Sequence, residues 1–123
     1  MKDPFLMRKI VFIAIAVSFS ACLQVFSDAF IYWQADLLHQ FWRLWTAHWV
    51  HVGWIHYVLN MLAFACLPFI FPRVKGWHFV ALLLLLPPLI SLSFYYGFPE
   101  IEAYAGLSGV LHGAYAAVAS VHL

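Results

Sequence analysis

The apolar positions of this chain fall into four long runs, separated by segments that are polar or aromatic. Each run has about the length that a helix needs to cross an apolar membrane core of ~30 Å. The pattern therefore predicts an all-α polytopic membrane protein, folded as a single domain over residues 1–123. The predicted helices lie at about residues 10–26, 54–71, 77–96 and 105–123.

Residues 27–53, between the first and second runs, are too many and too aromatic for a simple connection. Apolar residues recur at helical spacing from Leu37 to Trp45, so we predict an interfacial helix in part of this segment. Arg43 is expected to pair with an acidic neighbour or with a lipid phosphate. The aromatic residues expected at the level of the lipid headgroups are Trp33, Phe41, Trp42, Trp45, Trp49 and Trp54.

Three further features bear on the helices. Pro87 and Pro88 lie inside the third run and are expected to kink or break its helix, with neighbouring groups satisfying the freed carbonyls. Gly109 and Gly113 lie four residues apart in the fourth run, a spacing typical of close helix packing in lipid. The first run also resembles a cleavable signal sequence, but three apolar runs follow it, which favours a helix that is not cleaved.

Charge predicts the orientation in the membrane. By the positive-inside rule, the amino terminus and the turn at 72–76 are expected in the cytoplasm, while residues 27–53 and 97–104 face outward. The basic residues that decide this are Lys2, Arg8, Lys9, Arg73 and Lys75, and the acidic residues of the other connections are Asp28, Asp36, Glu100 and Glu102.

Composition excludes several classes of protein. Hydrophobic residues make up 66% of the chain and charged residues 9%, where a typical soluble domain has about a quarter charged residues. The net charge of +1, with no basic stripe, argues against nucleic acid as a partner. Cys22 and Cys66 lie within apolar runs and are interpreted as small hydrophobic residues, not as a disulfide.

Two polar motifs begin the second and fourth runs. His56 is followed one turn later by Asn60, and Ser108 stands in the sequence Gly106-Leu107-Ser108-Gly109. Polar groups are costly in hydrocarbon, so their presence at the starts of apolar helices indicates chemistry. A serine between glycines is open to a substrate, and an asparagine side chain can donate to a developing oxyanion. The predicted topology puts both motifs at the same membrane face, which indicates serine hydrolysis within the membrane.

Histidines offer an alternative. His48, His51 and His56 could be interpreted as ligands of zinc or haem, but no Cys, Asp or Glu nearby completes a set of four. Hydrogen-bonding histidines at the membrane interface are a second alternative. We predict neither a metal nor another cofactor.

These residues resemble the rhomboid family of intramembrane serine proteases. The resemblance runs from Trp42-Arg43 through His51, His56 and Asn60 to the Gly106–Gly109 motif, and the stretch through His112-Gly113 looks most like the rhombosortase branch. The resemblance implies a six-helix bundle with a cavity that opens outward. It also implies cleavage of membrane-anchored proteins near a carboxy-terminal transmembrane sorting tail, in a bacterial inner membrane, with the site facing the periplasm.

The same resemblance assigns roles to individual residues. Ser108 would be the nucleophile, and His56 and Asn60 would line the oxyanion hole. His51 would match a position that stabilises a loop or gates water, and Trp42-Arg43 a structural motif of the first outer loop. Gly106 and Gly109 would complete the motif around the serine.

One element of the family pattern is missing. Rhomboid proteases use a histidine base on their sixth helix, whereas this sequence has four apolar runs. His112 is one turn from Ser108 and is expected to pack beside the site; His122, 14 residues on, would lie about 21 Å away along the helix. We therefore expect an amino-terminal part of a rhomboid protease, with little or no peptidase activity alone. The alternative function is a non-catalytic module that binds membrane proteins.

Overall fold

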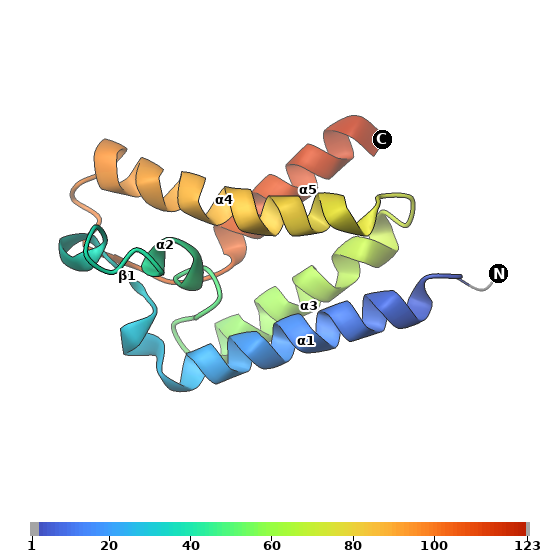
Figure 1. Ribbon diagram of the computed structural model, residues 1–123, viewed down its shortest axis with the longest axis horizontal. Helices are drawn as coiled ribbons and strands as arrows, with labels where there is room; N and C mark the ends of the chain where they lie inside the picture. Colours follow the sequence, from blue (N-terminus) through green and yellow to red (C-terminus); the bar gives the residue numbers. More distant parts are fainter. Residues whose placement is uncertain (1–2, 123) are drawn as a thin grey trace.

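Four long helices form the bundle in the computed structural model, which describes residues 3–122 (Figure 1). They are α1 (Leu6–Val25), α3 (Trp54–Ile70), α4 (Gly76–Gly97) and α5 (Ser108–His122). Short elements lie in the connections: η1 (Ser27–Ala29), β1 (Tyr32–Trp33), η2 (Gln34–Asp36), α2 (Arg43–Thr46) and β2 (Ala103–Tyr104). Helices α1 and α4 are long and apolar enough to cross a membrane, and α3 is a shorter apolar helix. The structure is a helical membrane-protein bundle, as the apolar pattern predicts.

The four long helices alternate in direction along the chain. Helices α1 and α4 run one way and α3 and α5 the other, as Figure 1 shows. The amino-terminal end of α1 and the turn between α3 and α4 therefore lie at one end of the bundle. Residues 26–53 and 98–107 lie at the opposite end, which we call the loop end. Both motif-bearing helices, α3 and α5, begin at the loop end.

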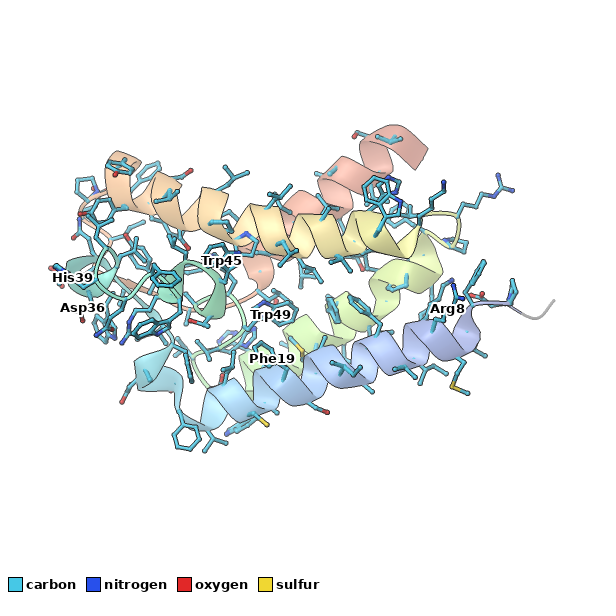
Figure 2. All side chains as sticks on the ribbon, in the orientation of Figure 1. Arg8, Phe19, Asp36, His39, Trp45 and Trp49 are labelled. Carbon is cyan, nitrogen blue, oxygen red and sulfur yellow. The ribbon has the colours of Figure 1, made fainter. Side chains whose placement is uncertain are left out.

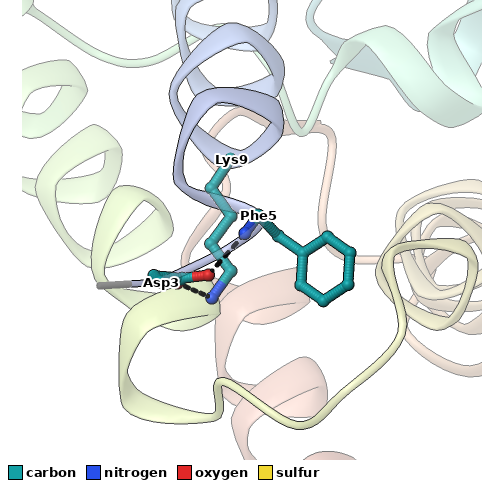
Figure 3. Close-up of polar contacts among 3 residues, drawn as sticks. All are labelled: Asp3, Phe5 and Lys9. Carbon is teal, nitrogen blue, oxygen red and sulfur yellow. Dashed lines mark hydrogen bonds and ion pairs between the residues drawn. The ribbon is translucent and has the colours of Figure 1, made fainter. Parts of the chain in front are cut away.

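Helix α1 begins at Leu6, four residues before the predicted start at residue 10. The Asp3 carboxylate accepts the backbone N–H of Phe5 at 2.8 Å and pairs with the Lys9 ammonium group (Figure 3). This acidic group beside the first turn satisfies a free N–H and favours the helix there. The hydropathy pattern missed this first turn because Arg8 and Lys9 interrupt the apolar run.

Helix α4 is continuous from Gly76 to Gly97, so of the two predicted effects of Pro87-Pro88, a kink or a break, the break does not occur. A proline at position 88 has no N–H for the carbonyl of Leu84, four residues earlier. The indole N–H of Trp45 donates to this Leu84 carbonyl at 2.8 Å. The loop thus supplies a donor to a carbonyl that the proline leaves free, as neighbouring groups do in membrane helices.

Helix α5 begins at Ser108, three residues after the predicted start. Residues 103–104 form β2, which pairs antiparallel with β1, so that Tyr32 lies opposite Tyr104. Gly106 has φ +127°, a conformation outside the right-handed helical region. The strand pairing and this glycine delay the helix until the serine.

The helices pack around an apolar core shared by α3 and α5. It contains Tyr57, Met61, Phe64, Leu107, Val110 and Leu111. On the side of α5 that faces α4, a Cβ atom at Gly113 would stand 3.2 Å from the Leu86 side chain, and one at Gly109 would stand 3.5 Å from Ile90. The two glycines therefore permit close contact between α5 and α4.

The segment 26–53 is a folded loop, and its longest helix is the four residues of α2, so the predicted interfacial helix is reduced to one turn. Arg43 is buried, and its guanidinium donates to the Gln40 side chain and to the backbone carbonyls of Asp28 and Ile31. Within residues 3–122 Arg43 makes no salt bridge, so the predicted pairing with an acidic neighbour is wrong. Backbone carbonyls satisfy the charge instead, which organises the loop around it.

The aromatic residues of this loop divide into two groups. Trp33, Phe41, Trp42 and Trp54 are exposed, in keeping with a position at the membrane surface. Trp45 and Trp49 are partly buried, and Trp49 packs edge-on against Phe64 of α3. Figure 2 shows both tryptophans between the loop and the helices. They belong to the packing between loop and bundle.

Candidate active site

Ser108 is exposed and is the first residue of α5, so its hydroxyl is accessible at the loop end. The turn before it is held by two hydrogen bonds from the first loop. The N–H of Gly106 donates to the carbonyl of Ala47 at 2.9 Å, and the N–H of Leu107 donates to Nε2 of His51 at 3.2 Å. The position of the serine is thus set by residues more than fifty positions earlier in the chain.

His51 is buried and connects this turn to α1. The side-chain amide of Gln24 accepts from the His51 N–H at 2.6 Å and donates to the His51 carbonyl at 2.7 Å. Because Nε2 accepts a hydrogen bond from the Leu107 N–H, the imidazole is neutral and carries its own proton on Nδ1. Burial, with a smaller contribution from the nearby His56, lowers the pKa of His51 to about 4. At neutral pH the ring therefore remains an acceptor.

His56 and Asn60 lie in the first two turns of α3, which begins after Gly53 with φ +89°. His56 is exposed, and the Asn60 side chain donates to the backbone carbonyl of His56 at 2.9 Å. Tyr57, next to His56, packs edge-on against the His51 ring at 5.9 Å between centroids. The start of α3 therefore lies beside the histidine that holds the Ser108 turn.

His112 is the histidine nearest to Ser108 along α5. Its Nδ1 lies 2.7 Å from the Ser108 carbonyl and 3.5 Å from the Ser108 hydroxyl. A carbonyl can only accept, so Nδ1 carries the proton and donates it to this carbonyl. That nitrogen is then unable to accept the serine proton. The side chain of His122 lies outside the described residues.

The sequence motifs did not include three residues that organise the site, Gln24, Ser91 and Tyr104, and they singled out His48 only as an alternative metal ligand. Nε2 of His48 lies 2.8 Å from the Ser91 hydroxyl, and the His48 and Tyr104 rings pack at 5.4 Å between centroids. Gln24 and Ser91 are polar residues within apolar runs. They could have been selected from the sequence for this reason, because such residues need hydrogen-bond partners in a membrane protein. Their partners are far away in sequence, so spacing alone does not reveal them.

The histidines of the loop do not converge. Within residues 3–122 the structure has no group of three or more His, Cys, Asp or Glu side chains placed to bind one metal ion. His39 and Asp36 lie exposed at the extreme of the loop end, as Figure 2 shows. His48 and His51 are buried and each bonds to a different part of the protein, Ser91 and Leu107.

The protein is a helical membrane bundle. Its candidate site is an exposed serine at the start of a helix, and a loop that contains a buried histidine holds the turn before this serine. The family model of the Rhomboid domain matches residues 38–123, from the first loop to the end of α5. This chain belongs to the rhomboid family, an intramembrane protease-type family, and is an integral membrane protein. Neither the curated proteins nor the solved structures gave a match.

Proposed function

We propose that this protein is a serine endopeptidase of the rhombosortase type, which cleaves membrane-anchored proteins near a carboxy-terminal transmembrane tail. Ser108 acts as the nucleophile in this proposal. The observation that carries it is the exposed serine at the start of α5, after a turn whose two N–H groups bond to the first loop. A nucleophile held in this way costs little reorganisation when it reacts.

The oxyanion of the tetrahedral intermediate needs donors on the same side as the serine. The first backbone N–H groups of a helix have no partner within the helix, and the helix dipole favours negative charge there. The Ser108 N–H is such a group in our proposal, and the Asn60 amide is the second donor. Asn60 now donates to the His56 carbonyl, so it must rotate toward the substrate in the reactive complex.

The general base is the component that residues 3–122 do not supply. Nδ1 of His112 is occupied by the Ser108 carbonyl, and the nucleophile needs a base to take its proton. In our proposal the base is a histidine outside residues 3–122, as the rhomboid resemblance implies. The same observation favours the second candidate function, a non-catalytic module that binds transmembrane segments.

The test is expression from the protein's own gene in a membrane, with a tethered reporter and a fluorophosphonate probe. Ser108→Ala should abolish reporter cleavage and labelling. Ser93→Ala is the matched control, because Ser93 is an exposed serine that bonds only within α4. Cleavage that survives Ser108→Ala would remove Ser108 from the mechanism. Wild-type protein that neither cleaves nor labels would favour the binding module.

We further propose a bacterial inner membrane, with the amino terminus in the cytoplasm and the loop end facing the periplasm. Basic Arg73 and Lys75 lie in the turn between α3 and α4, and acidic Glu100 and Glu102 lie at the opposite end. A cysteine at position 100 should react with an impermeant maleimide in intact cells, in a background without Cys22 and Cys66. A cysteine at position 75 should react only after permeabilisation, and the reverse pattern would overturn this orientation.

A further inference from the structure

A buried polar chain crosses from α4 to the first loop, behind the turn that carries Ser108. His48 and Ser91 each have 0% exposed surface. Nε2 of His48 lies 2.8 Å from Oγ of Ser91, and this Oγ lies 2.9 Å from the carbonyl oxygen of Leu44. Two groups of the first loop thus share one hydroxyl of α4 in the interior of the protein.

The direction of each hydrogen bond follows from counting protons. A serine hydroxyl has a single proton, and a carbonyl can only accept, so Ser91 donates to Leu44. Ser91 must then accept from His48, whose proton is on Nε2. Burial lowers the pKa of His48 to about 4, so the imidazole is neutral near pH 7. The chain therefore runs from His48 through Ser91 to the loop backbone.

His48 stands between the two acceptors that hold the Ser108 turn. Ala47, the preceding residue, accepts from Gly106, and His51, one turn later, accepts from Leu107. A displacement of His48 would move both acceptors, because they belong to the same short stretch of backbone. The polar chain is thus placed to fix this stretch against α4.

The His48 ring has a second contact on the side of the site. It packs against Tyr104, the residue of β2 that lies opposite Tyr32. The Tyr104 hydroxyl lies 3.3 Å from where a Cβ atom at Gly109 would stand, directly after Ser108. Tyr104 therefore lies between the His48 ring and the residue that follows Ser108.

We propose that His48 and Ser91 form a latch that positions Ser108, by holding residues 47–51 against α4. Neither side chain contacts Ser108, so both are positioning residues. The consequence for catalysis rests on the proposed function, whereas the latch itself is a property of the fold. It can therefore be measured without any substrate.

The first experiment measures amide hydrogen exchange by NMR in micelles. Ser91→Ala should speed exchange of the Gly106 and Leu107 amides about tenfold, which is the effect of losing roughly one net hydrogen bond. Ser93→Ala is the matched control, because Ser93 lies two residues away on α4 and bonds to the Leu89 carbonyl. Equal exchange in the two variants would overturn the latch.

Substitutions at His48 test the direction of the bond and remain informative if Ser91→Ala fails to fold. Glutamine can place an N–H group near the position of Nε2, whereas asparagine is too short and phenylalanine fills the volume without a donor. His48→Gln should keep exchange of Leu107 slow, and His48→Asn and His48→Phe should both speed it. Slow exchange in His48→Phe would show that packing alone suffices and would overturn the proposal.

The catalytic consequence is tested separately. The exchange effect of Ser91→Ala should persist in a Ser108→Ala background, where no reaction is possible. If Ser108→Ala leaves reporter cleavage intact, the proposed function fails while the exchange result still stands. If exchange quickens in Ser91→Ala but the single-turnover cleavage rate equals that of Ser93→Ala, the latch does not position the nucleophile and the inference fails.

Discussion

The starts of α3 and α5 carry the two motifs, and they differ in how firmly the protein holds them. The turn before α5 bonds through two N–H groups to residues 47–51, which are fixed in turn by Gln24 and Ser91. At the start of α3, His56 is exposed and Asn60 bonds to its own helix. In the proposed mechanism, the part of the site that carries the nucleophile is therefore fixed before substrate binds, whereas Asn60 must still reorient to serve as an oxyanion donor. This difference predicts which changes affect folding and which affect only the reaction.

Acidification should cause the largest loss of stability, through the two buried histidines in the loop that holds the turn before α5. The pKa of His48 and that of His51 are both lowered by burial to about 4 from an ordinary value of 6.5. The unfolded chain therefore binds protons that the folded chain does not, and the free energy of unfolding falls as the pH drops from 6.5 to about 4. The loss is on the order of 3 kcal/mol for His48, and it is smaller for His51, which lies in less deeply buried surroundings. Unfolding in mixed micelles at several pH values measures it.

The control for this pH dependence is His39, which is exposed at the loop end. His39→Asn should leave the loss of stability between pH 6.5 and 4 unchanged, whereas His51→Gln should reduce it. The attribution to buried histidines is wrong if His51→Gln and wild type show the same dependence.

Gly106→Ala should destabilise the α5 side by about 2 kcal/mol, because φ +127° is a conformation that only glycine adopts at low cost. Space is not the cause, since the nearest atom to a new Cβ would be Cδ2 of His51 at 3.8 Å. The temperature of thermal unfolding and the rate of cleavage should both be lower in this variant. Gly97→Ala is a suitable control, because no atom lies within 4 Å of its Cβ position and its φ is not positive.

His51→Leu should cost about 1–2 kcal/mol, because the Leu107 N–H loses its acceptor while the Gln24 bonds to the backbone of residue 51 can remain. His51→Gln offers a carbonyl oxygen as a replacement acceptor and should cost less. Unfolding measurements on both variants decide this, and equal losses would assign the role of His51 to ring packing.

Asn60→Ala should change stability least, by under about 1 kcal/mol, since its hydrogen bond is to its own helix and is partly exposed. The cleavage rate, however, should fall by about 10²–10³, as is typical for loss of an oxyanion donor. A variant that loses stability and activity in proportion would contradict the contrast between the two helix starts.

The sequence predicted the parts of this fold that depend on local apolar runs. The four helices lie close to the predicted ranges, and the early start of α1 and late start of α5 come from the Asp3 contacts and the β1–β2 pairing. The sequence left open whether the prolines kink or break α4, and it did not identify the donor to the free carbonyl, because that donor is Trp45, a residue of another segment. Proline rules describe an isolated helix, and here a neighbour alters the outcome.

The candidate site also has parts that the sequence predicted and parts that it did not. The motifs around Ser108 and Asn60 are short, so spacing was enough to select them as candidates. The buried bonds of His48, His51 and Arg43 join segments that only the fold brings together, or replace an expected ion pair by backbone carbonyls. Periodicity shows which face of a helix is apolar, but it does not show the partner of a polar residue.

The distances in sequence between bonded groups also set an order of events during synthesis. The hydrogen bonds of the Arg43 side chain lie within residues 28–43, so this part of the loop can form as soon as it emerges. Tyr32 and Tyr104 are about 70 residues apart, an interval on the order of 4–14 s at ribosomal rates. The partners of His48 and His51 also emerge late, at Ser91 and Leu107. The loop is therefore completed only after α4 has been made, and the nascent chain carries no assembled site while its first helices enter the membrane.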